Sequence, residues 1–261
     1  MAENPSYVIV GRGRWARAMH GILTVECRRS VFLEEPRRRL SESEAAYMLR
    51  LSQAMAASGA QIAWLCVPPG PHIPSMVKAA TMAGLHTVVE KPWVCSRAES
   101  DSLLALAQAR GVLVAIHYEY CLLEGVEGWR DRFNQGSGLC FGGRFNVSRI
   151  DPSPILTVDN LRSHLLAIRA YAVPKSTVAE IHCGYGLPDE RNVWLEAHGR
   201  RTGHIDFLKN DEPIIQRFIS KLEAALEGAD FPFGLGFASQ VADGVDALKR
   251  EQAGAARLGI P

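Results

Sequence analysis

The chain has 261 residues and a net charge of +1, and 47% of its residues are hydrophobic and 22% charged. This composition is typical of a globular protein that is long enough to bury a core. The near balance of charges argues against nucleic acid as a partner, and no apolar run approaches the roughly 20 residues that a bilayer crossing needs.

Strands and helices alternate through the first part of the sequence. Residues 7–10 form a short apolar run that ends directly in a glycine turn, which is typical of a buried parallel strand. This alternation predicts a Rossmann domain over residues 1–118, an α/β fold with a doubly wound parallel sheet. We find no clear third strand between Leu33 and Ile62. The remaining expected strands cover residues 30–34, 62–67, 86–89 and 112–116, and the expected helices cover residues 15–23, 41–57, 73–83 and 98–110.

The pattern changes after residue 118. Longer, partly alternating strands and amphipathic helices predict a smaller α+β domain over residues 119–261, with a mainly antiparallel open sheet. We interpret residues 199–203 as the loop of a hairpin, and we expect the C-terminal helix to pack back on the first domain. The expected strands cover residues 142–150, 177–185, 192–198 and 204–208, and the expected helices cover residues 161–172, 213–226 and 237–251.

Neither the N-terminus nor the cysteines suggest a secreted protein. Residues 1–6 lack a basic stretch followed by an apolar run, so no secretory signal is visible. The six cysteines are widely scattered and contain no C-x-x-C pair. This spacing favours free thiols over a zinc site or a disulfide framework. We therefore expect a cytoplasmic protein that binds no metal.

The glycine turn after the first strand carries the first functional signal. Residues 11–16 read G-R-G-R-W-A, between a predicted strand and a predicted helix. Gly11 permits a tight turn, Gly13 lets the backbone approach a pyrophosphate, and Ala16 lets the helix pack closely on the strand. The alternative is a glycine turn without a ligand. We assign the cofactor contacts of this turn to Gly11, Gly13, Arg14, Trp15 and Ala16, with Arg12 as a further charged candidate.

The residues at the end of the second strand bear on whether the cofactor is NAD or NADP. Dinucleotide sites place an acidic residue about 20 positions after the glycine turn, where it holds the ribose hydroxyls. Glu34 or Glu35 falls at this position. The arginines at residues 37–39 form either a 2′-phosphate contact or a solvated surface turn. The residues alone therefore leave NAD and NADP as alternatives.

The stretch that follows carries a recognisable order of motifs. A strand ends in V-P-P at residues 67–69, with His72 nearby, and a helix then closes in A-G at residues 83–84. The next strand runs into Glu-Lys-Pro at residues 90–92, followed by an Ala/Leu-rich helix. Together with the glycine turn, this order resembles the Gfo/Idh/MocA oxidoreductase family over most of residues 6–120. The second domain resembles the family only diffusely, and it is shorter than the family's usual one.

The resemblance implies an activity and a set of cofactor contacts. Members of the family carry out NAD(P)-dependent oxidation of sugar and cyclitol alcohols, or reduction of carbonyls and imines, and their open sheet often forms a dimer. Lys91 would touch the nicotinamide ribose and the substrate and take part in proton transfer, and the Lys91–Pro92 bond is frequently cis in the family. A lysine suits this role because desolvation beside a cationic ring lowers its pKa. The remaining predicted cofactor contacts are Pro68, His72, Glu90 and Pro92.

The family's second motif is Asp-x-x-x-His on a helix whose side chains face the substrate. His164 matches the histidine and would be the general acid/base, but Asn160 stands where the family has Asp. An amide orients a hydroxyl but cannot take up a proton, and this favours reduction of a carbonyl or imine. His117 and Tyr118 are further candidates for substrate contact. The alternative for His164 is a histidine packed under the sheet.

Two classes of function follow from these residues. The first is an NAD(P)-dependent oxidoreductase that acts on a small polar substrate, as a homo-oligomer. The second is a non-catalytic dinucleotide-binding or scaffold protein that retains the family fold, which Asn160 and the short second domain would explain. A third, simpler alternative is that the glycine loop binds another nucleotide or none.

Overall fold

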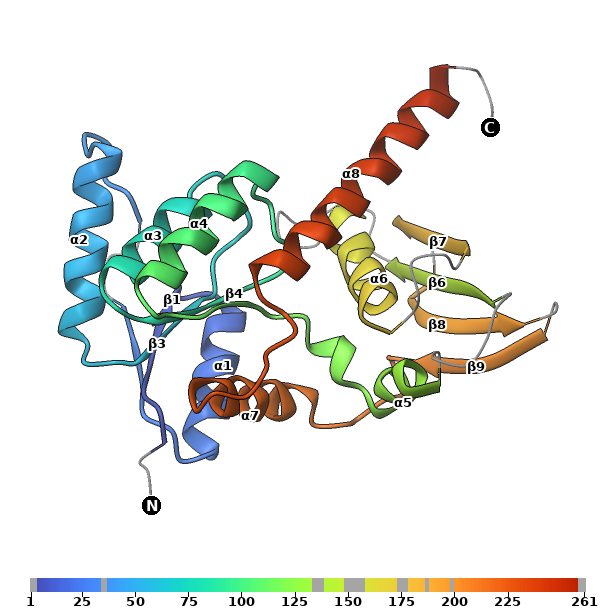
Figure 1. Ribbon diagram of the computed structural model, residues 1–261, viewed down its shortest axis with the longest axis horizontal. Helices are drawn as coiled ribbons and strands as arrows, with labels where there is room; N and C mark the ends of the chain where they lie inside the picture. Colours follow the sequence, from blue (N-terminus) through green and yellow to red (C-terminus); the bar gives the residue numbers. More distant parts are fainter. Residues whose placement is uncertain are drawn as a thin grey trace. The chain divides into compact units, whose positions relative to one another are not determined.

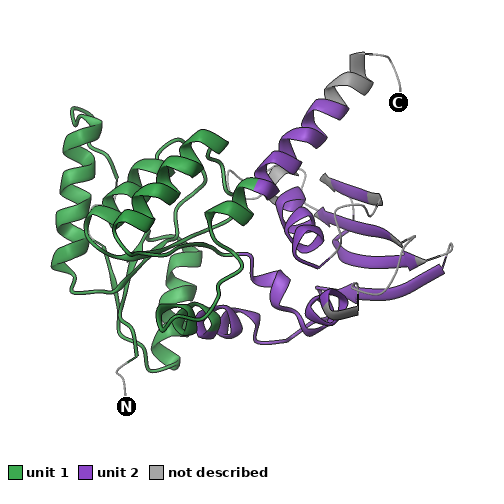
Figure 2. Cartoon of the chain, viewed as in Figure 1, with its two compact units in different colours: residues 1–117, 221–239 green, residues 118–220, 240–261 purple. Residues whose placement is uncertain are grey.

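The chain forms two compact units. Residues 1–117 and 221–239 make unit 1, and residues 118–220 and 240–261 make unit 2 (Figure 2). The first boundary follows residue 117, and the other two fall within helices α7 (Ile214–Leu226) and α8 (Leu235–Arg257). Across the part of the chain that is described, no helix has both the length and the apolar character that a membrane crossing requires. The computed structural model describes residues 4–33, 37–132, 139–147, 158–172, 178–185, 188–197 and 200–257.

Unit 1 is built on a five-stranded parallel sheet with the order β2-β1-β3-β4-β5. The strands β1 and β3 are buried along their whole length because helices cover both faces of the sheet: α3 and α4 lie on one face and α1 on the other (Figure 1). This confirms the predicted Rossmann sheet. The strands are β1 (Tyr7–Val10), β2 (Ser30–Phe32), β3 (Ile62–Leu65), β4 (His86–Val89) and β5 (Val114–Ile116), and the helices are α1 (Arg14–Val25), α2 (Glu44–Ala57), α3 (Ile73–Met82) and α4 (Arg97–Ala109).

The helix α4 begins where the sequence supplies a complete cap. The Ser96 hydroxyl accepts a hydrogen bond from the Glu99 backbone N–H, and the Glu99 carboxylate accepts one from the Ser96 backbone N–H. Two of the four N–H groups that a helix leaves unpaired at its start are thereby satisfied. Local sequence alone thus determines where this helix starts.

The third strand that the sequence failed to reveal is also missing from the described fold. Between Leu33 and Ile62, the described residues contain α2 as their regular element, and β1 pairs directly with β3. The second strand is shorter than predicted, because β2 ends at Phe32. The sheet therefore has five strands.

Unit 2 contains a mixed, mostly antiparallel sheet with the order β7-β6-β8-β9, in which β6 and β7 alone are parallel. A Cβ on Gly143 of β6 would contact the Leu165 side chain, so α6 packs closely on this strand. The predicted α+β architecture is confirmed. The elements are the short 3-10 helix η1 (Glu119–Leu122), α5 (Glu124–Arg132), β6 (Leu139–Val147), α6 (Val158–Ala172), β7 (Val178–Tyr185), β8 (Glu190–Ala197) and β9 (Arg200–Asp206).

The predicted hairpin between the last two strands is present, but its loop is shorter than expected. We placed the loop at residues 199–203, whereas β9 already begins at Arg200, which pairs with Ala197. A register shift between Leu195 and Glu196 accommodates this continued pairing. A β-bulge of this kind keeps strands paired where the sequence pattern alone suggests a loop.

A C-terminal segment, residues 221–239, completes unit 1. Glu223 accepts two hydrogen bonds from the Arg28 guanidinium, at 2.6 Å each, and one from the Tyr7 hydroxyl at 2.7 Å. Further along, the Phe233 carbonyl accepts a hydrogen bond from the Ile116 N–H at 2.8 Å. Because these contacts cover the edge strand β5 and fix a buried ion pair, the Rossmann unit depends on residues far apart in the sequence.

We expect Glu223→Ala to lower the free energy of unfolding by about 2–3 kcal/mol, because it leaves the Arg28 guanidinium and the Tyr7 hydroxyl largely buried without their acceptor. Urea unfolding followed by circular dichroism measures the change. The exposed Glu227 on the same chain segment is the matched control, and Glu227→Ala is expected to change stability by less than about 0.5 kcal/mol. Equal effects of the two substitutions would contradict this account of the segment.

Candidate functional site

The glycine turn follows β1 and has a backbone that only glycine can adopt. Gly11 has a φ of +132°, and a Cβ at this position would collide with the Cys66 carbonyl oxygen. Ala16 is fully buried against the sheet, as a close contact between helix and strand requires. Gly13, in contrast, has ordinary backbone angles and no described atom within 4 Å of where its Cβ would stand. Gly11 is therefore required for the close packing of the turn on the sheet, whereas the space beside the Gly13 Cα is open.

This turn lies at the point in the sheet where the order of the strands reverses. The strand β1 has β2 on one side and β3 on the other, so the connections after β1 and β3 leave toward opposite faces. Parallel α/β sheets bind ligands in the crevice at such a point, beyond the carboxyl ends of the strands. Gly13 is the N-cap of α1 but makes no side-chain cap, and the first turn holds no acidic residue. The free N–H groups and the helix dipole there suit the phosphates of a dinucleotide.

Lys91 lies against the first turn of α1. Its Nζ is 5.6 Å from the ring centroid of Trp15, a cation–π distance. The Lys91–Pro92 peptide bond is cis, as the resemblance implied. Trp15 remains 37% exposed, so its indole is partly buried yet still accessible at this edge. The structure thus brings the Glu-Lys-Pro motif and the glycine turn together, although about 75 residues separate them in the sequence.

A buried carboxylate stands next to this lysine. The Glu90 Oε1 accepts a hydrogen bond from the Trp64 Nε1 at 2.9 Å and lies 3.1 Å from the His117 Nδ1. Burial alone raises the pKa of Glu90, but His117, Lys91 and a hydrogen bond from Trp15 outweigh it and lower the pKa to about 2. Glu90 is therefore an ionised carboxylate at neutral pH.

Two indole rings surround the imidazole that faces Glu90. The His117 ring stacks on Trp15 with centroids 6.1 Å apart and meets the edge of Trp64 at 5.2 Å. His117 was predicted to contact substrate, but its side chain is fully buried and its Nδ1 faces Glu90. Sequence reasoning missed Trp64 because an aromatic residue in a buried strand is usually core. Its indole N–H, which needs an acceptor when buried, was the available signal.

Three other residues were predicted to contact the cofactor, and the structure describes the positions of two of them. Pro68 is exposed in the connection after β3, at the same carboxyl edge as the glycine turn. His72 is the N-cap of α3, and its ring lies 2.9 Å from where a Cβ on Gly70 would stand. Glu34 lies outside the described residues, so the predicted ribose contact has no structural description.

The predicted residues of the second domain belong to unit 2. The His164 side chain is 8% exposed and packs beside Tyr120, with ring centroids 4.9 Å apart, and Phe145, at 5.8 Å. Tyr118 is buried in the same unit. The side chain of Asn160 lies outside what the structure describes, although its backbone belongs to α6. Lys91 is in unit 1 and His164 in unit 2.

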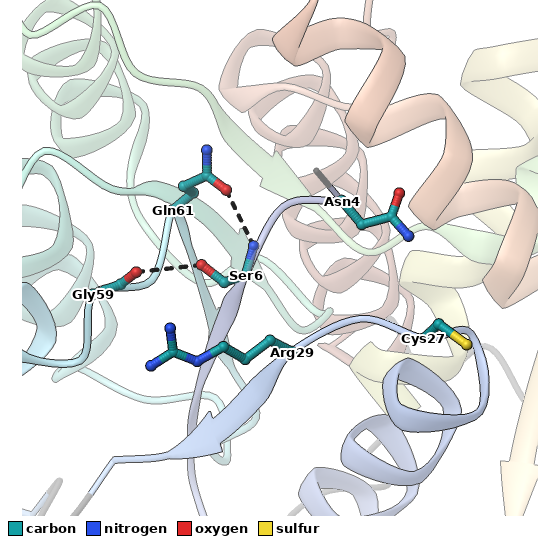
Figure 3. A pocket seen from close by; sticks show the side chains of 6 residues that line it. All are labelled: Asn4, Ser6, Cys27, Arg29, Gly59 and Gln61. Carbon is teal, nitrogen blue, oxygen red and sulfur yellow. Dashed lines mark hydrogen bonds between the residues drawn. The ribbon is translucent and has the colours of Figure 1, made fainter. Parts of the chain in front are cut away.

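A separate hollow in unit 1 lies at the opposite edge of the sheet (Figure 3). It has a volume of about 660 Å³, and its lining residues precede the first three strands. This is the amino edge, away from the crevice where parallel sheets bind ligands. The Ser6 backbone N–H donates a hydrogen bond there to the Gln61 Oε1 at 3.1 Å. We assign no function to this hollow, which is lined by Asn4, Ser6, Cys27, Arg29, Gly59 and Gln61.

The turn, the switch point of the sheet and the adjacent lysine define a dinucleotide-binding Rossmann domain. Residues 6–118 match the model of the Gfo/Idh/MocA family, an oxidoreductase family with an NAD-binding Rossmann fold. Over these residues, which make up less than half of the chain, the protein is similar to the Gfo/Idh/MocA oxidoreductase family. The uncharacterized oxidoreductase YfiI of Bacillus subtilis is 25% identical over 174 residues, which cover 56% of this chain and 44% of that protein. The match thus spans less than half of that relative.

Solved structures share the fold over nearly the whole chain. GenD2 from gentamicin A biosynthesis, in complex with NAD, is 17% identical with a TM-score of 0.73, covering 97% of this chain and 95% of that one. UDP-N-acetylglucosamine 3-dehydrogenase GnnA from Acidithiobacillus ferrooxidans is 14% identical with a TM-score of 0.73, covering 92% and 95%. The WlbA dehydrogenase from Thermus thermophilus, with NAD and α-ketoglutarate, is 14% identical with a TM-score of 0.67, covering 91% and 92%. At these identities, the likeness establishes the fold alone.

Substitution of the two glycines of the turn is expected to affect stability to different extents. We expect Gly11→Ala to destabilise the protein by about 1–3 kcal/mol or more, because the methyl group meets the Cys66 carbonyl and the φ is strained. Gly13→Ala is expected to leave stability within about 0.5 kcal/mol, because its Cβ enters open space. Thermal unfolding of the two variants side by side measures this. A strongly destabilised Gly13→Ala would contradict the described turn.

The Glu90 carboxylate makes stability depend on pH in acid. Its pKa of about 2 in the folded chain lies below the ordinary 4.5, so its contribution is fully present above pH 4.5 and is lost as the pH falls toward 2. We expect the wild type to lose unfolding free energy between pH 4.5 and 3 more steeply than Glu90→Gln, which has no proton to take up. Urea titrations at stepped pH measure the two slopes, with Glu227→Gln as the control that follows the wild type. Parallel slopes for Glu90→Gln and the wild type would refute the ionised carboxylate.

Proposed function

We propose that the chain is an NAD-dependent oxidoreductase that transfers a hydride between the nicotinamide and a small polar substrate. The observation that carries this proposal is the contact between Lys91 and Trp15, because it brings the lysine of the Glu-Lys-Pro motif next to the glycine turn. The bound nicotinamide would supply the hydride chemistry. The chain would hold the cofactor, orient the substrate and exclude water.

Different residues of unit 1 would bind the cofactor and transfer the proton. The α1 N-terminus, with Gly11, Gly13 and Ala16, holds the pyrophosphate, and Arg14 adds positive charge beside it. Pro68, His72 and Pro92 border the same edge as further cofactor contacts, and Glu34 holds the adenosine ribose. Lys91 contacts the nicotinamide ribose and the substrate, and its Nζ exchanges the proton that accompanies hydride transfer.

Unit 2 would supply the substrate contacts. His164 acts as a second proton donor, and Asn160 and Tyr118 orient the substrate. An amide at position 160 cannot take up a proton, which favours reduction of a carbonyl or imine over oxidation of an alcohol. Solved structures of the same fold include a dehydrogenase named for UDP-N-acetylglucosamine, which supports a sugar-like or cyclitol-like substrate. We extend the proposal to a homodimer in the cytoplasm.

A second candidate function is a dinucleotide-binding scaffold without turnover. The observation that favours it is the replacement of the family's acid by Asn160. A screen of UDP-sugars, cyclitols and carbonyl or imine compounds separates the two functions. Cofactor binding without oxidation or reduction of any panel compound would favour the scaffold.

For a substrate found in that screen, we expect Lys91→Met to lower kcat by about 100-fold or more, because it removes the proton-transferring group. NADH binding, measured by fluorescence, should weaken far less, because the phosphate turn is intact. Lys78→Met is the matched control: Lys78 belongs to α3 and lies outside the site, so both parameters should stay at wild-type values. Unchanged turnover in Lys91→Met would remove Lys91 from the proposed mechanism.

A further inference from the structure

The helices α5 and α6 pack on the same face of the unit 2 sheet. Gly143 of β6 and Gly203 of β9 pair with alternate residues of β8, so side chains at both positions would point to one side of the sheet. A Cβ on Gly143 would contact Leu165 of α6, and a Cβ on Gly203 would contact Trp129 of α5. Both helices therefore lie on this side, and the alternate positions of each strand point to the other.

A hollow of about 530 Å³ lies on that other side of the sheet. Its volume is within the range of about 300–1,000 Å³ that is usual for small-molecule sites. Arg144 and Asn146 line the hollow and alternate with Gly143 along β6, so they point away from α6. His182 of β7 pairs with Arg144, and Glu190 of β8 pairs with Asn146. These four side chains thus share one face, and the lining is completed by Ile181, Cys183 and Pro188.

Asn146 is the deeply buried polar residue of this hollow. It is only 7% exposed, and within the part of the chain that is described its side-chain amide has no hydrogen-bond partner. An amide carries two donor hydrogens and a carbonyl acceptor, and burying them without partners costs free energy. Because Asn146 lines the hollow, a molecule bound there can supply these partners. The position of Asn146 therefore indicates a ligand.

The charged groups around the hollow are already paired within the chain. The Arg144 guanidinium lies 3.4 Å from Glu190 Oε2, and the His182 Nε2 lies 2.8 Å from Glu180 Oε1. The other Glu190 oxygen accepts a hydrogen bond from the Asn192 amide at 2.9 Å. This arrangement leaves no excess positive charge for a phosphate group. Among the described residues, no group of three His, Cys, Asp or Glu side chains could hold a metal ion.

We propose that this hollow binds a neutral polyhydroxyl molecule of the sugar or cyclitol class through Arg144, Asn146 and Glu190. A hydroxyl group both donates and accepts hydrogen bonds, so neighbouring hydroxyls can satisfy a guanidinium, an amide and a carboxylate together. The site is separate from the substrate contacts proposed above, because His164 packs beside Phe145 on the opposite face of the sheet. The inference does not depend on the proposed redox function.

Nuclear magnetic resonance of the isotope-labelled full chain, without cofactor, tests this site. The neutral probes are N-acetyl-D-glucosamine and myo-inositol, and inorganic phosphate is the anionic one. We expect the neutral probes to shift the backbone amides of residues 144–146 and 181–183 and the side-chain amide of Asn146. Lys91→Met should bind these probes as the wild type does, so failure of the proposed function leaves this test intact.

Two variants separate ligand binding from a structural role. Arg144→Met should weaken binding by about tenfold or more, because it removes hydrogen bonds from a charged group. Its side chain is 43% exposed, so we expect the fold to persist. Asn146→Leu should abolish binding yet keep or raise the temperature of thermal unfolding, since it removes a buried amide that has no partner in the described chain. Arg200→Met, on the exposed part of β9, is the matched control and should bind like the wild type.

Several results would overturn the proposal. Neither neutral probe shifting these amides would do so, as would wild-type affinity in folded Arg144→Met and Asn146→Leu. Shifts with phosphate alone would show an anion site instead. Sedimentation of the wild type and Arg144→Met tests whether a second copy of the chain occupies this face. A dimer that Arg144→Met weakens, in a protein that binds neither neutral probe, would assign the hollow to that interface.

Discussion

The close approach of Gly11 to the Cys66 carbonyl is the constraint on which the site depends. It lets the chain leave β1 and turn at once into α1, although the chain that follows the paired strand β3 lies directly beside the turn. The connections after these two strands then diverge to opposite faces and open the crevice in which parallel sheets hold their ligands. With a side chain at position 11, the turn would have to move away from the sheet and the α1 N-terminus would lose its place.

The second determinant of the site is the largely buried negative charge of the Glu90 carboxylate. A carboxylate with little exposure is stable only when donors surround it, and Glu90 has an indole N–H and an imidazole within 3.1 Å. The imidazole also stacks on Trp15, and the Lys91 Nζ lies 5.6 Å from the centroid of that indole ring. Lys91 therefore contacts an indole that packs on the same buried imidazole as Glu90 does.

Much of unit 1 could be predicted because its local signals agree. The apolar run before Gly11 predicts a buried strand, the Ser96–Glu99 cap predicts where α4 starts, and the alternation of elements predicts the parallel sheet. The contact of Trp64 with Glu90 could not be predicted, since it joins two strands through side chains whose spacing carries no pattern. The same holds for Glu223, whose ion pair with Arg28 spans 195 positions of sequence.

Unit 2 was predicted by class but less well in detail. Alternation predicted strands and a mostly antiparallel sheet, whereas the pairing of Arg200 with Ala197 depends on a bulge that the sequence does not mark.

The central claim, a nicotinamide dinucleotide bound at the α1 N-terminus, is tested most directly by a crystal structure of the protein with NADH. The account predicts a pyrophosphate over Gly13 and the nicotinamide C4 within reach of the Lys91 Nζ. A dinucleotide bound elsewhere, or a nicotinamide remote from Lys91, would contradict it.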